Sequence, residues 1–307
     1  MTFIVRKIRL TFILGTGSFG ETGRNTVTVE GLRVQAHIIK TGATAMGEAQ
    51  LRIHGLTPTL LNALTSIYTV TQLQRRNTII VEAGDDVVGV RKVFEGGITV
   101  AQADLNQQPD SVLNIIAHAG LIFCVQPKSE GVDAFIGYTS YPAPATVDTI
   151  LSAMAPQMGL RFENNGVDKT LDTPYFKGAI REQVLAVIAA ASCEWNNGDD
   201  GVLAIWPKGG HRAKIVDVPI ISPETGMIGY PAYSNLGLMV RTLFNPNIVF
   251  GGQIEVKSSI PQANYRWNVY GLSYQLESET PGGAWLTEIH GFSVDAVTGT
   301  SPVTVPK

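Results

Sequence analysis

The sequence predicts a mainly β, α+β protein in which two β-rich parts flank an inserted α/β module. Residues 226–289 consist of short apolar runs separated by turn residues, including the dipeptides Asn245-Pro246 and Gly251-Gly252. Apolar and polar residues alternate from 253 to 258, which is the period of a half-buried strand. In the middle of the chain the apolar residues recur with helical spacing instead. The three expected domains are residues 1–104, 105–210 and 211–307.

The first part is expected to consist mainly of strands. A glycine-rich turn at 15–23 separates the first two strands, and Gly96-Gly97 predicts another turn. Thr57 is a good N-cap and Pro58 suits the first helical position, so one short helix is expected here. Its apolar face would contain Leu60, Leu61 and Leu64. The predicted strands are 5–14, 25–39, 49–54, 78–82, 88–94 and 98–103.

The middle part combines helices with strands. Apolar residues in helical register give the strongest helix prediction, at 180–193. Thr146 predicts the start of a second helix that runs to 158, after the linker Pro142-Ala143-Pro144, and Pro109 predicts the start of a third that runs to about 119. Extended segments are expected at 121–126, at 202–206 and from 161 onward, with a tight turn at 196–201.

From about Arg212 the strand pattern returns and continues toward the C-terminus. Residues 238–244 form a long predicted strand with few charges, which suits pairing with a partner better than a free edge does. Residues 297–307 are rich in Thr, Ser and Pro and are expected to form a loose tail.

The chain has few charged residues and almost no net charge. Charged residues make up 16% of its 307 residues, against about 25% in ordinary soluble chains. Either neighbouring molecules cover part of its surface, or its cores are unusually well filled. A net charge of −3 without a basic stripe argues against sequence-specific binding of nucleic acid.

The sequence gives no sign of a membrane span or a signal peptide. No uninterrupted apolar run approaches the ~18 residues that a spanning helix needs. The N-terminal residues interleave basic and apolar side chains and lack a cleavage site. We therefore expect the chain to be made in the cytoplasm.

One segment fits a nucleotide-binding pattern. Gly15 to Gly20 reads G-x-G-x-x-G after a predicted strand. In dinucleotide-binding proteins this loop begins a helix whose N-terminus holds the pyrophosphate. Here residues 25–29 are strand-like, so a hairpin loop is favoured and no cofactor is expected.

The histidines and cysteines do not form an evident metal or nucleophile site. No carboxylate or cysteine lies at ligand spacing from His37 or His54. A nucleophile pair of His118 and Cys124 is conceivable, but their apolar neighbours favour a histidine at the edge of the core. Cys124 and Cys193 are favoured as two buried thiols over a single disulfide. The remaining histidines are His211 and His290.

The paired carboxylates and the tryptophans have structural interpretations. Asp85-Asp86 and Asp199-Asp200 lie beside glycines and are expected to be solvated turn residues. Acid–base catalysis would need two carboxylates in separate environments. Core anchoring is favoured over a sugar-binding platform for Trp195, Trp206, Trp267 and Trp285. We expect no catalytic, cofactor-binding or metal-binding residue and no enzymatic activity.

Five segments carry a resemblance to a known family. Near the C-terminus they are GMIGY followed by Pro231, LFNPNIVFGGQIEVKSS at 243–259 and GLSYQLES at 271–278. Toward the N-terminus they are IIKTGATAMGEAQLRIHGLTPTLLNALT at 38–65 and VFEGGITVAQADLNQQPDSVLNIIA at 93–117. Together they resemble the tail or baseplate hub proteins of contractile-tailed phages, over most of the chain.

The resemblance implies a structural virion protein. Hub proteins of this kind hold two related β-barrel or sandwich domains similar to the tail-tube subunit. Three copies then place six such domains in a ring, so a homotrimer joins the six-fold tail tube to the three-fold central spike and leaves a channel for the genome. The implied partners are the tail tube protein, the central spike protein, baseplate wedge proteins and the tape-measure protein. Residues 25–39 and 49–54 are expected to form lumen or interface sheet.

Two other classes of function remain open at this point. One is a tail-associated enzyme that degrades the cell wall, which would need a carboxylate pair in a cleft. The other is a receptor-binding module, which would bind cells directly.

Overall fold

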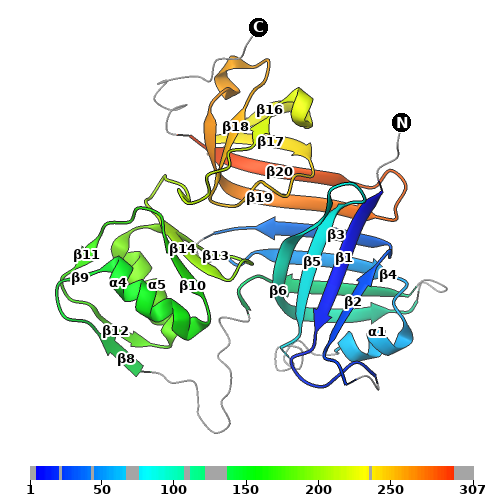
Figure 1. Cartoon of the computed structure of the whole chain (residues 1–307), viewed down its shortest axis with the longest axis horizontal. Coiled ribbons are helices and arrows are strands. Elements are labelled where there is room, and N and C mark those ends of the chain that lie inside the picture. The colour runs from blue at the N-terminus through cyan, green and yellow to red at the C-terminus, as the bar shows by residue number, and fades with distance from the viewer. Residues whose placement is uncertain are drawn as a thin grey trace.

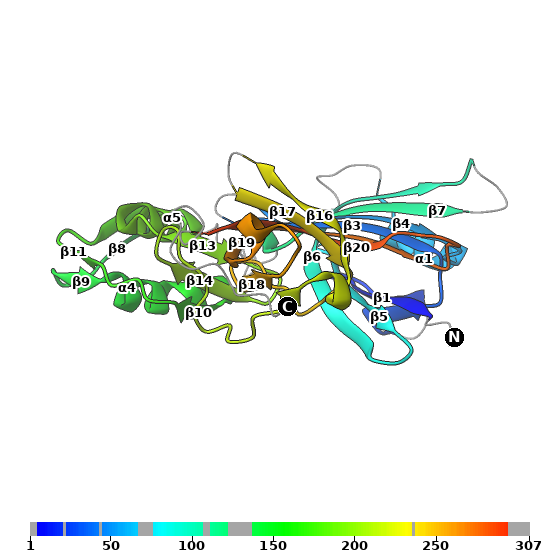
Figure 2. The same ribbon diagram turned by 90° about the horizontal axis from the view of Figure 1, so that it is seen from above.

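The computed structural model describes residues 5–20, 23–42, 45–66, 76–106, 111–121, 137–234 and 237–293. Within these residues the protein is mainly β, with a minority of helix, as the sequence predicts. Figure 1 shows a large sheet assembled from the first and third parts of the chain, and a separate α/β module formed by the middle part. Seen from above in Figure 2, the module lies at one end of an elongated molecule.

The large sheet has thirteen strands among the described residues, and most of them follow one path. The order along that path is β16-β17-β20-β19-β3-β4-β7-β6-β5-β1-β2. Beside this path, β18 pairs with β19, and β15 pairs with β18. Strands from the first part are β1 (Arg6–Ile13), β2 (Thr26–Glu30), β3 (Val34–Lys40), β4 (Glu48–His54), β5 (Thr78–Asp85), β6 (Gly89–Asp104) and β7 (Val112–His118). Strands from the third part are β15 (Ile220–Ile221), β16 (Met227–Ser234), β17 (Gly237–Leu243), β18 (Gln253–Val256), β19 (Arg266–Ser278) and β20 (Trp285–Phe292).

The pairing of β19 with β3 joins the two ends of the chain. Their antiparallel register runs from Leu272 opposite Lys40 to Ser278 opposite Val34. The main hydrophobic core accordingly takes residues from both parts, with Ile8, Leu10, Phe12, Ile38, Leu51 and Ile79 beside Leu272, Tyr274, Leu276 and Ile289. The expected division into three domains stays a prediction, although strands of the first and third parts share one core.

The single strand predicted at 25–39 is two strands. Gly31 has a φ of +75°, a left-handed conformation that glycine adopts without strain, and it ends β2. The strands on either side of Gly31 have different partners: β2 pairs with β1, whereas β3 pairs with β4 and β19.

The sequence predicts a turn at Gly96-Gly97. In the structure these residues form a corner within one long strand, β6. β6 pairs with β5 up to Gly97 and with β7 from Gly97 onward, so it passes from one layer of the core to the other. A side chain at 96 would place Cβ 2.6 Å from the carbonyl oxygen of His118 and 2.7 Å from the ring of Phe94. Glycine therefore permits the close approach that the corner requires.

The helix predicted at 109–119 is wrong. Residues 112–118 form β7, which is paired on both sides, with β4 and with β6. Leu113, Ile115 and Ala117 alternate toward the core, so pairing on both edges overrides the local helical signal. Pro109 and the strand predicted at 121–126, apart from Leu121, lie outside the described residues, as does the predicted C-terminal tail.

The short helix of the first part is confirmed. Helix α1 (Pro58–Leu64) begins after Thr57, whose hydroxyl accepts a hydrogen bond from the backbone N–H of Leu60 at 3.4 Å. Leu61 and Leu64 are buried in the main core, so α1 packs its apolar face against that core.

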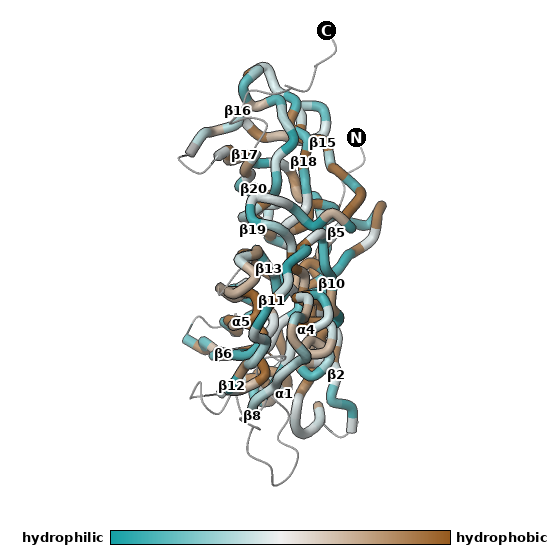
Figure 3. The backbone as a smooth tube through the Cα atoms, turned by 90° about the vertical axis from the view of Figure 1, so that its left-hand side faces the viewer, coloured by the Kyte–Doolittle hydropathy of each residue, from teal (hydrophilic) through white to brown (hydrophobic). Residues whose placement is uncertain are grey.

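The α/β module has its own hydrophobic core around two helices. Helices α4 (Val147–Met154) and α5 (Ile180–Ala191) confirm the two strongest helix predictions, and the 3-10 turn η2 (Ala155–Met158) extends α4 to the expected end. Figure 3 colours hydrophobic residues along α4 and α5, the helices whose buried side chains form this core. The strands are β8 (Gly137–Ser140), β9 (Ala145–Thr146), β10 (Arg161–Asn164), β11 (Thr170–Leu171), β12 (Tyr175–Gly178), β13 (Glu194–Asn197) and β14 (Val202–Trp206).

Strand β14 is buried on both faces. It lies between β10 and β13 in a three-stranded sheet, parallel to β10. Leu203 and Ile205 face the helices, whereas Val202, Ala204 and Trp206 form a small cluster with Phe250 of the large sheet. This strand is thus the apolar contact between the module and the sheet.

We expect Gly96→Val to destabilise the protein. The added side chain has to displace backbone at His118, and overpacking of this kind costs about 1–3 kcal/mol in the free energy of unfolding. Urea unfolding followed by tryptophan fluorescence measures it. The matched control is Gln102→Val on the exposed side of the same strand, for which a change within about 0.5 kcal/mol is expected. Equal effects of the two substitutions would contradict the corner.

Candidate functional site

Eight neighbouring strands form one layer with an open face. They are β16, β17, β20, β19, β3, β4, β7 and the second half of β6, all antiparallel to their neighbours. Side chains alternate across the layer, so buried Ala36, Leu51 and Ile115 face the core while Gln35, Gln50 and Asn114 face the other way.

The middle of the open face is lined by polar side chains, carboxamides together with three ionisable groups. A shallow hollow of about 550 Å³ spans β19, β3, β4 and β7. Gln35, Gln50, Asn114 and Gln275 line this hollow together with His37, Arg52 and Glu277, and Gln102 lies opposite Asn114 on β6. We call the four glutamines and Asn114 the carboxamide band. Each carboxamide offers hydrogen-bond donors and acceptors without net charge, so the five residues of the band can bind water but add no charge to the face.

Charged groups around the band are mostly paired with one another. His118 Nε2 lies 3.3 Å from a carboxylate oxygen of Glu48, and Arg241 Nε donates to Glu288 at 2.8 Å. Burial raises the pKa of Glu288, but hydrogen bonds from Arg241 and His290 outweigh it and leave that pKa below its usual value. Among the described residues, the charges of the open face thus do not form a basic stripe of the kind that binds a nucleic-acid backbone tightly.

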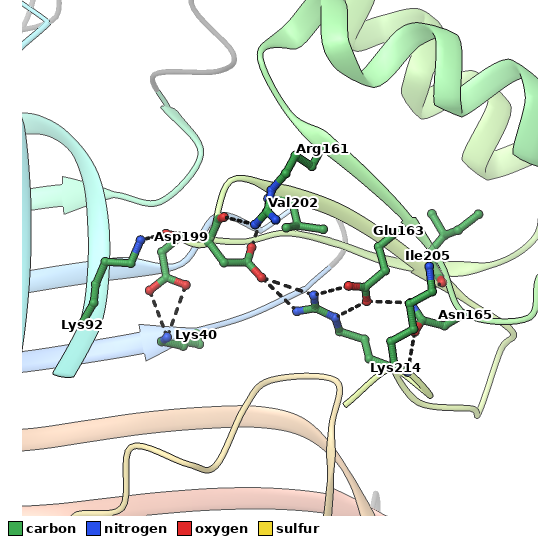
Figure 4. Close-up of polar contacts among 11 residues, drawn as sticks. Lys40, Lys92, Arg161, Glu163, Asn165, Asp199, Val202, Ile205 and Lys214 are labelled. Carbon is green, nitrogen blue, oxygen red and sulfur yellow. Dashed lines mark hydrogen bonds and ion pairs between the residues drawn. The ribbon is translucent and has the colours of Figure 1, made fainter. Parts of the chain in front are cut away.

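The second polar feature is the junction between the module and the large sheet (Figure 4). Lys40 at the end of β3 lies 2.9 Å from the carboxylate of Asp199 in the β13–β14 turn, and Lys92 donates to the carbonyl of Asp199 at 3.2 Å. Burial is the largest single effect on Lys40 and lowers its pKa, but the charge of Asp199 acts together with its hydrogen bond, Tyr274 and Asp200 to raise the pKa overall. Lys40 therefore remains cationic.

Arg212 ties three segments together at this junction. Its guanidinium donates to both carboxylate oxygens of Glu163 on β10, at 3.0 and 3.2 Å, and to Asp200 at 3.3 Å. Its backbone N–H donates to the carbonyl of Gly251 in the large sheet's loop at 2.7 Å. Only 5% of Arg212 is exposed, so this is a buried, bidentate ion pair.

Glu163 is held in its charged form by these contacts. Burial raises the pKa of Glu163, but hydrogen bonds from Arg212 and Asn165 outweigh burial and lower it overall. Asn165 also accepts a hydrogen bond from the backbone N–H of Lys214, which fixes the segment after Arg212 on the module.

An apolar contact completes the junction. The ring centroids of Trp206 and Phe250 lie 6.3 Å apart. Gly42 lies so close to Phe250 that an added Cβ would approach the ring to 2.6 Å. The junction is therefore a small aromatic contact surrounded by paired charges.

The structure separates the residues that the sequence singles out. Gly15 to Gly20 lie in a loop that leads to strand β2, which is the hairpin interpretation. His37, His118 and His290 lie on β3, β7 and β20 at the open face, and His54 lies at the end of β4. Burial lowers the pKa of His211 in the segment that precedes Arg212. Cys124 lies outside the described residues, and burial raises the pKa of the Cys193 thiol.

The two carboxylate pairs compare differently with their predicted role as solvated turn residues. Asp85 accepts hydrogen bonds from the backbone of Val87 and Val88, as expected of a turn residue. The prediction is wrong for Asp199, whose side chain is only 15% exposed and is paired with Lys40. Trp206 and Trp267 are buried, whereas Trp195 and Trp285 are partly buried against the two cores.

Sequence reasoning missed Lys40 and Arg212. A signal did exist, since Asp199-Asp200 is a dense acidic pair in a chain with few charges. Its cationic partners are 159 residues away for Lys40 and 12 for Arg212, and sequence spacing identifies neither.

The described residues show neither a metal-binding cluster nor a membrane-spanning helix. No group of three or more His, Cys, Asp or Glu side chains is placed to hold a metal ion. No helix in the described ranges has the length and apolar character needed to cross a membrane.

We expect Arg212→Ala to loosen the module. Removing the guanidinium leaves Glu163 and Asp200 without their buried partner, which costs about 3–5 kcal/mol in unfolding free energy. Urea unfolding and limited proteolysis measure it. Arg241→Ala is the matched control, because that arginine is 56% exposed and its pair is worth at most about 1 kcal/mol. Similar losses in both variants would contradict a junction held by Arg212.

Glu163 also predicts a pH dependence of stability. Its pKa in the folded protein is lowered, so the unfolded chain binds more protons as the pH falls, and stability decreases with acidification. The contribution is complete above the ordinary glutamate pKa of 4.5 and is lost as the pH falls through the lowered value. In Glu163→Gln this part of the acid dependence should vanish. Thermal unfolding from about pH 3 to pH 7 tests it, and an unchanged acid slope would contradict it.

The chain was compared with known proteins. A family model described as "Baseplate hub gp41" matches residues 8–281. No curated protein sequence gave a significant match.

Solved structures of similar fold come from phage tails and related assemblies. A tail protein from Neisseria meningitidis MC58 has a TM-score of 0.59 at 10% identity, over 94% of this chain and 97% of that one. The 43 kDa tail protein of prophage MuSo2 from Shewanella oneidensis has the same score and identity, over 94% and 98%. A half-lidded Francisella PdpA–VgrG complex has a TM-score of 0.54 at 7% identity, over 100% of this chain and 60% of that one.

At these identities the structural matches show a shared fold. The family model covers far more than half of the chain and includes both the carboxamide band and the junction. The protein therefore belongs to the baseplate hub gp41 family.

Proposed function

We propose that the chain is a structural tail or baseplate protein that forms a homotrimeric hub, joins the tail tube to the central spike and leaves a channel for the genome. The observation that carries the proposal is the continuous eight-strand layer, in which the first and third parts of the chain contribute four strands each. In this proposal each part is one domain of the tail-tube type, with domains at 1–104 and 211–307 around the module at 105–210.

The open face of the layer is suited to line such a channel. Its centre carries the carboxamide band, and the charges around it pair locally. Among the described residues, a nucleic-acid backbone would meet hydrogen-bonding groups and the single arginine Arg52 at the centre of the face, not a row of cations that would retain it. DNA could therefore pass without sequence-specific binding.

The free edge of the layer favours closure into a ring. Among the described strands, β16 pairs only with β17. It carries no charged residue and exposes Tyr230 to 75% and Tyr233 to 54%, so charge does not protect this edge, although Pro231 and a bulge between Ile228 and Ala232 interrupt its hydrogen-bonding pattern. Contact between β16 and the β6 end of the layer in the next copy would be heterologous, and such contacts close into rings.

The interface expected from sequence lies on a different strand. Residues 238–244 were predicted to pair with a partner, but β17 is paired on both sides, with β16 and with β20. The adjacent strand β16 takes that role in the proposal.

The remaining partners follow from the hub role. The tube, spike and wedge proteins and the tape-measure protein would contact the ends and outer surface of the ring. The chain would be made in the host cytoplasm and would act in the virion baseplate. The proposed role requires no catalytic site.

Lysine on the free edge should prevent assembly. We expect the wild-type chain to show a light-scattering mass of three times 33.0 kDa, and Ile228→Lys with Ala232→Lys to show 33.0 kDa. Circular dichroism confirms that the variant is folded, and negative-stain images show whether the wild-type particle has a central opening.

The control places the same two charges on another exposed site. Val87→Lys with Val88→Lys changes a hairpin tip at which each valine is 71% exposed, and the mass should stay trimeric. A compact dimer of the wild-type chain, or a trimer that survives the β16 substitutions, would refute this ring.

A further inference from the structure

We propose that the outer tip of the α/β module is a docking surface for an extended acidic segment of a different baseplate protein. This inference rests on the proposed function, because it takes the partner from the same assembly. The surface is the outward face of strands β8 and β12, and we call it the tyrosine face. It consists of Tyr138, Ser140, Tyr175 and Lys177.

The tyrosine face exposes two large aromatic side chains side by side. Tyr138 is 73% exposed and Tyr175 is 59% exposed, and their ring centroids lie 6.1 Å apart in a stacked arrangement. Phe176, on the opposite side of β12, is buried in the module core. The core therefore does not need these tyrosines, and exposed tyrosine of this kind is typical of binding surfaces.

The backbone under the tyrosines is fixed before any partner binds. Tyr175 lies opposite Ser140, and Lys177 lies opposite Tyr138 in the antiparallel pair. Hydrogen bonds from Gln183 on α5 to the carbonyls of Gly178 and Gly137, at 2.9 and 3.5 Å, anchor both strands to the module. A surface that is ordered in advance loses little entropy when it binds.

The free edges of this ribbon favour a polypeptide as the occupant. Among the described strands, β8 and β12 pair only with each other, so each has an edge with backbone groups available to a third strand. An extended peptide can use those groups and lay its side chains over the tyrosines. A sugar could stack on the rings but could not add a strand.

Charge favours an acidic segment. Lys177 is the charged residue of the tyrosine face and takes part in no ion pair with the described residues. The nearest carboxylate of α5, Glu182, is turned to the backbone N–H of Ala179 at 3.0 Å, where it caps the helix. A carboxylate from the partner would therefore meet an unpaired ammonium.

The position of the face fits a partner other than a second copy in the same ring. Figure 1 shows β8 and β12 at the end of the module that points away from the large sheet, whereas the free edge β16 lies on the sheet itself. A ring closed through β16 leaves the tyrosine face available to other proteins.

The test is a photo-crosslink in assembled tails. The full chain carrying Tyr138→p-benzoylphenylalanine is supplied to a host infected with phage that lacks it, tails are purified and irradiated, and the crosslinked peptide is sequenced. We expect one product with a different virion protein, at a segment that contains Asp or Glu next to apolar residues. The same crosslinker at Val216, which is 85% exposed in the segment between β14 and β15, should not give this product.

Charge substitutions complete the test. Lys177→Glu should reduce the crosslink yield about tenfold or more, because like charges then face each other, whereas Lys177→Arg should retain it. Circular dichroism shows that both variants fold. The proposal is overturned by a crosslink only to another copy of this chain, by no crosslink, or by equal yields in the two variants. Binding of a neutral oligosaccharide at Tyr138 with no protein product would also overturn it.

The two proposals fail in different ways. If the chain does not enter tails at all, the proposed hub function is wrong. If it enters tails normally and Tyr138 gives no acidic partner, only the docking surface is wrong.

Discussion

The antiparallel pairing of β19 with β3 is the constraint on which the rest of the structure depends. It joins segments more than 230 residues apart and turns two groups of four strands into one layer. The register also places Lys40 opposite Leu272, next to the buried ring of Tyr274. That position is where the module's Asp199 meets Lys40, so the same strand pair fixes both the open face and the junction.

Among the described residues, the most buried ion pairs lie where segments from different parts of the chain meet. Arg212 joins β10, the β13–β14 turn and the loop at Gly251, and Lys40 joins β3 to the same turn. Buried pairs of this kind add little net stability compared with apolar packing, but losing one partner is costly. They therefore specify how the module sits on the sheet, while the contact of Trp206 with Phe250 supplies the apolar part.

The low overall charge can now be related to particular surfaces. Both cores are well filled, which accounts for much of the apolar content. Apolar and aromatic side chains nevertheless remain exposed at β16 and on the tyrosine face, where Tyr230, Tyr233, Tyr138 and Tyr175 are all more than half exposed. These exposed aromatic side chains are the ones that the two proposals assign to contacts with other molecules.

The sequence by itself determined the local elements whose signals are short-range. The N-cap of Thr57, the helical register of 180–193 and the alternation along β18 and β19 identify their elements, because caps and periodicity depend on neighbours in the chain. The same local signals supported the expected absence of a nucleotide-binding loop at Gly15 to Gly20. The family resemblance could also be recognised from the sequence alone, because its segments lie in both β-rich parts.

Only the tertiary structure decided the features that depend on distant partners. Residues 112–118 became a strand because β4 and β6 pair on both sides, and Gly96 became a corner because β6 changes partners there. Asp199 became part of an ion pair because folding brings Lys40 to it. The carboxamide band exists only once β19, β3, β4 and β7 are adjacent, since its members are scattered from 35 to 275 in the sequence. Side-chain alternation fixes which face a residue occupies, but the order of the strands fixes which residues share it.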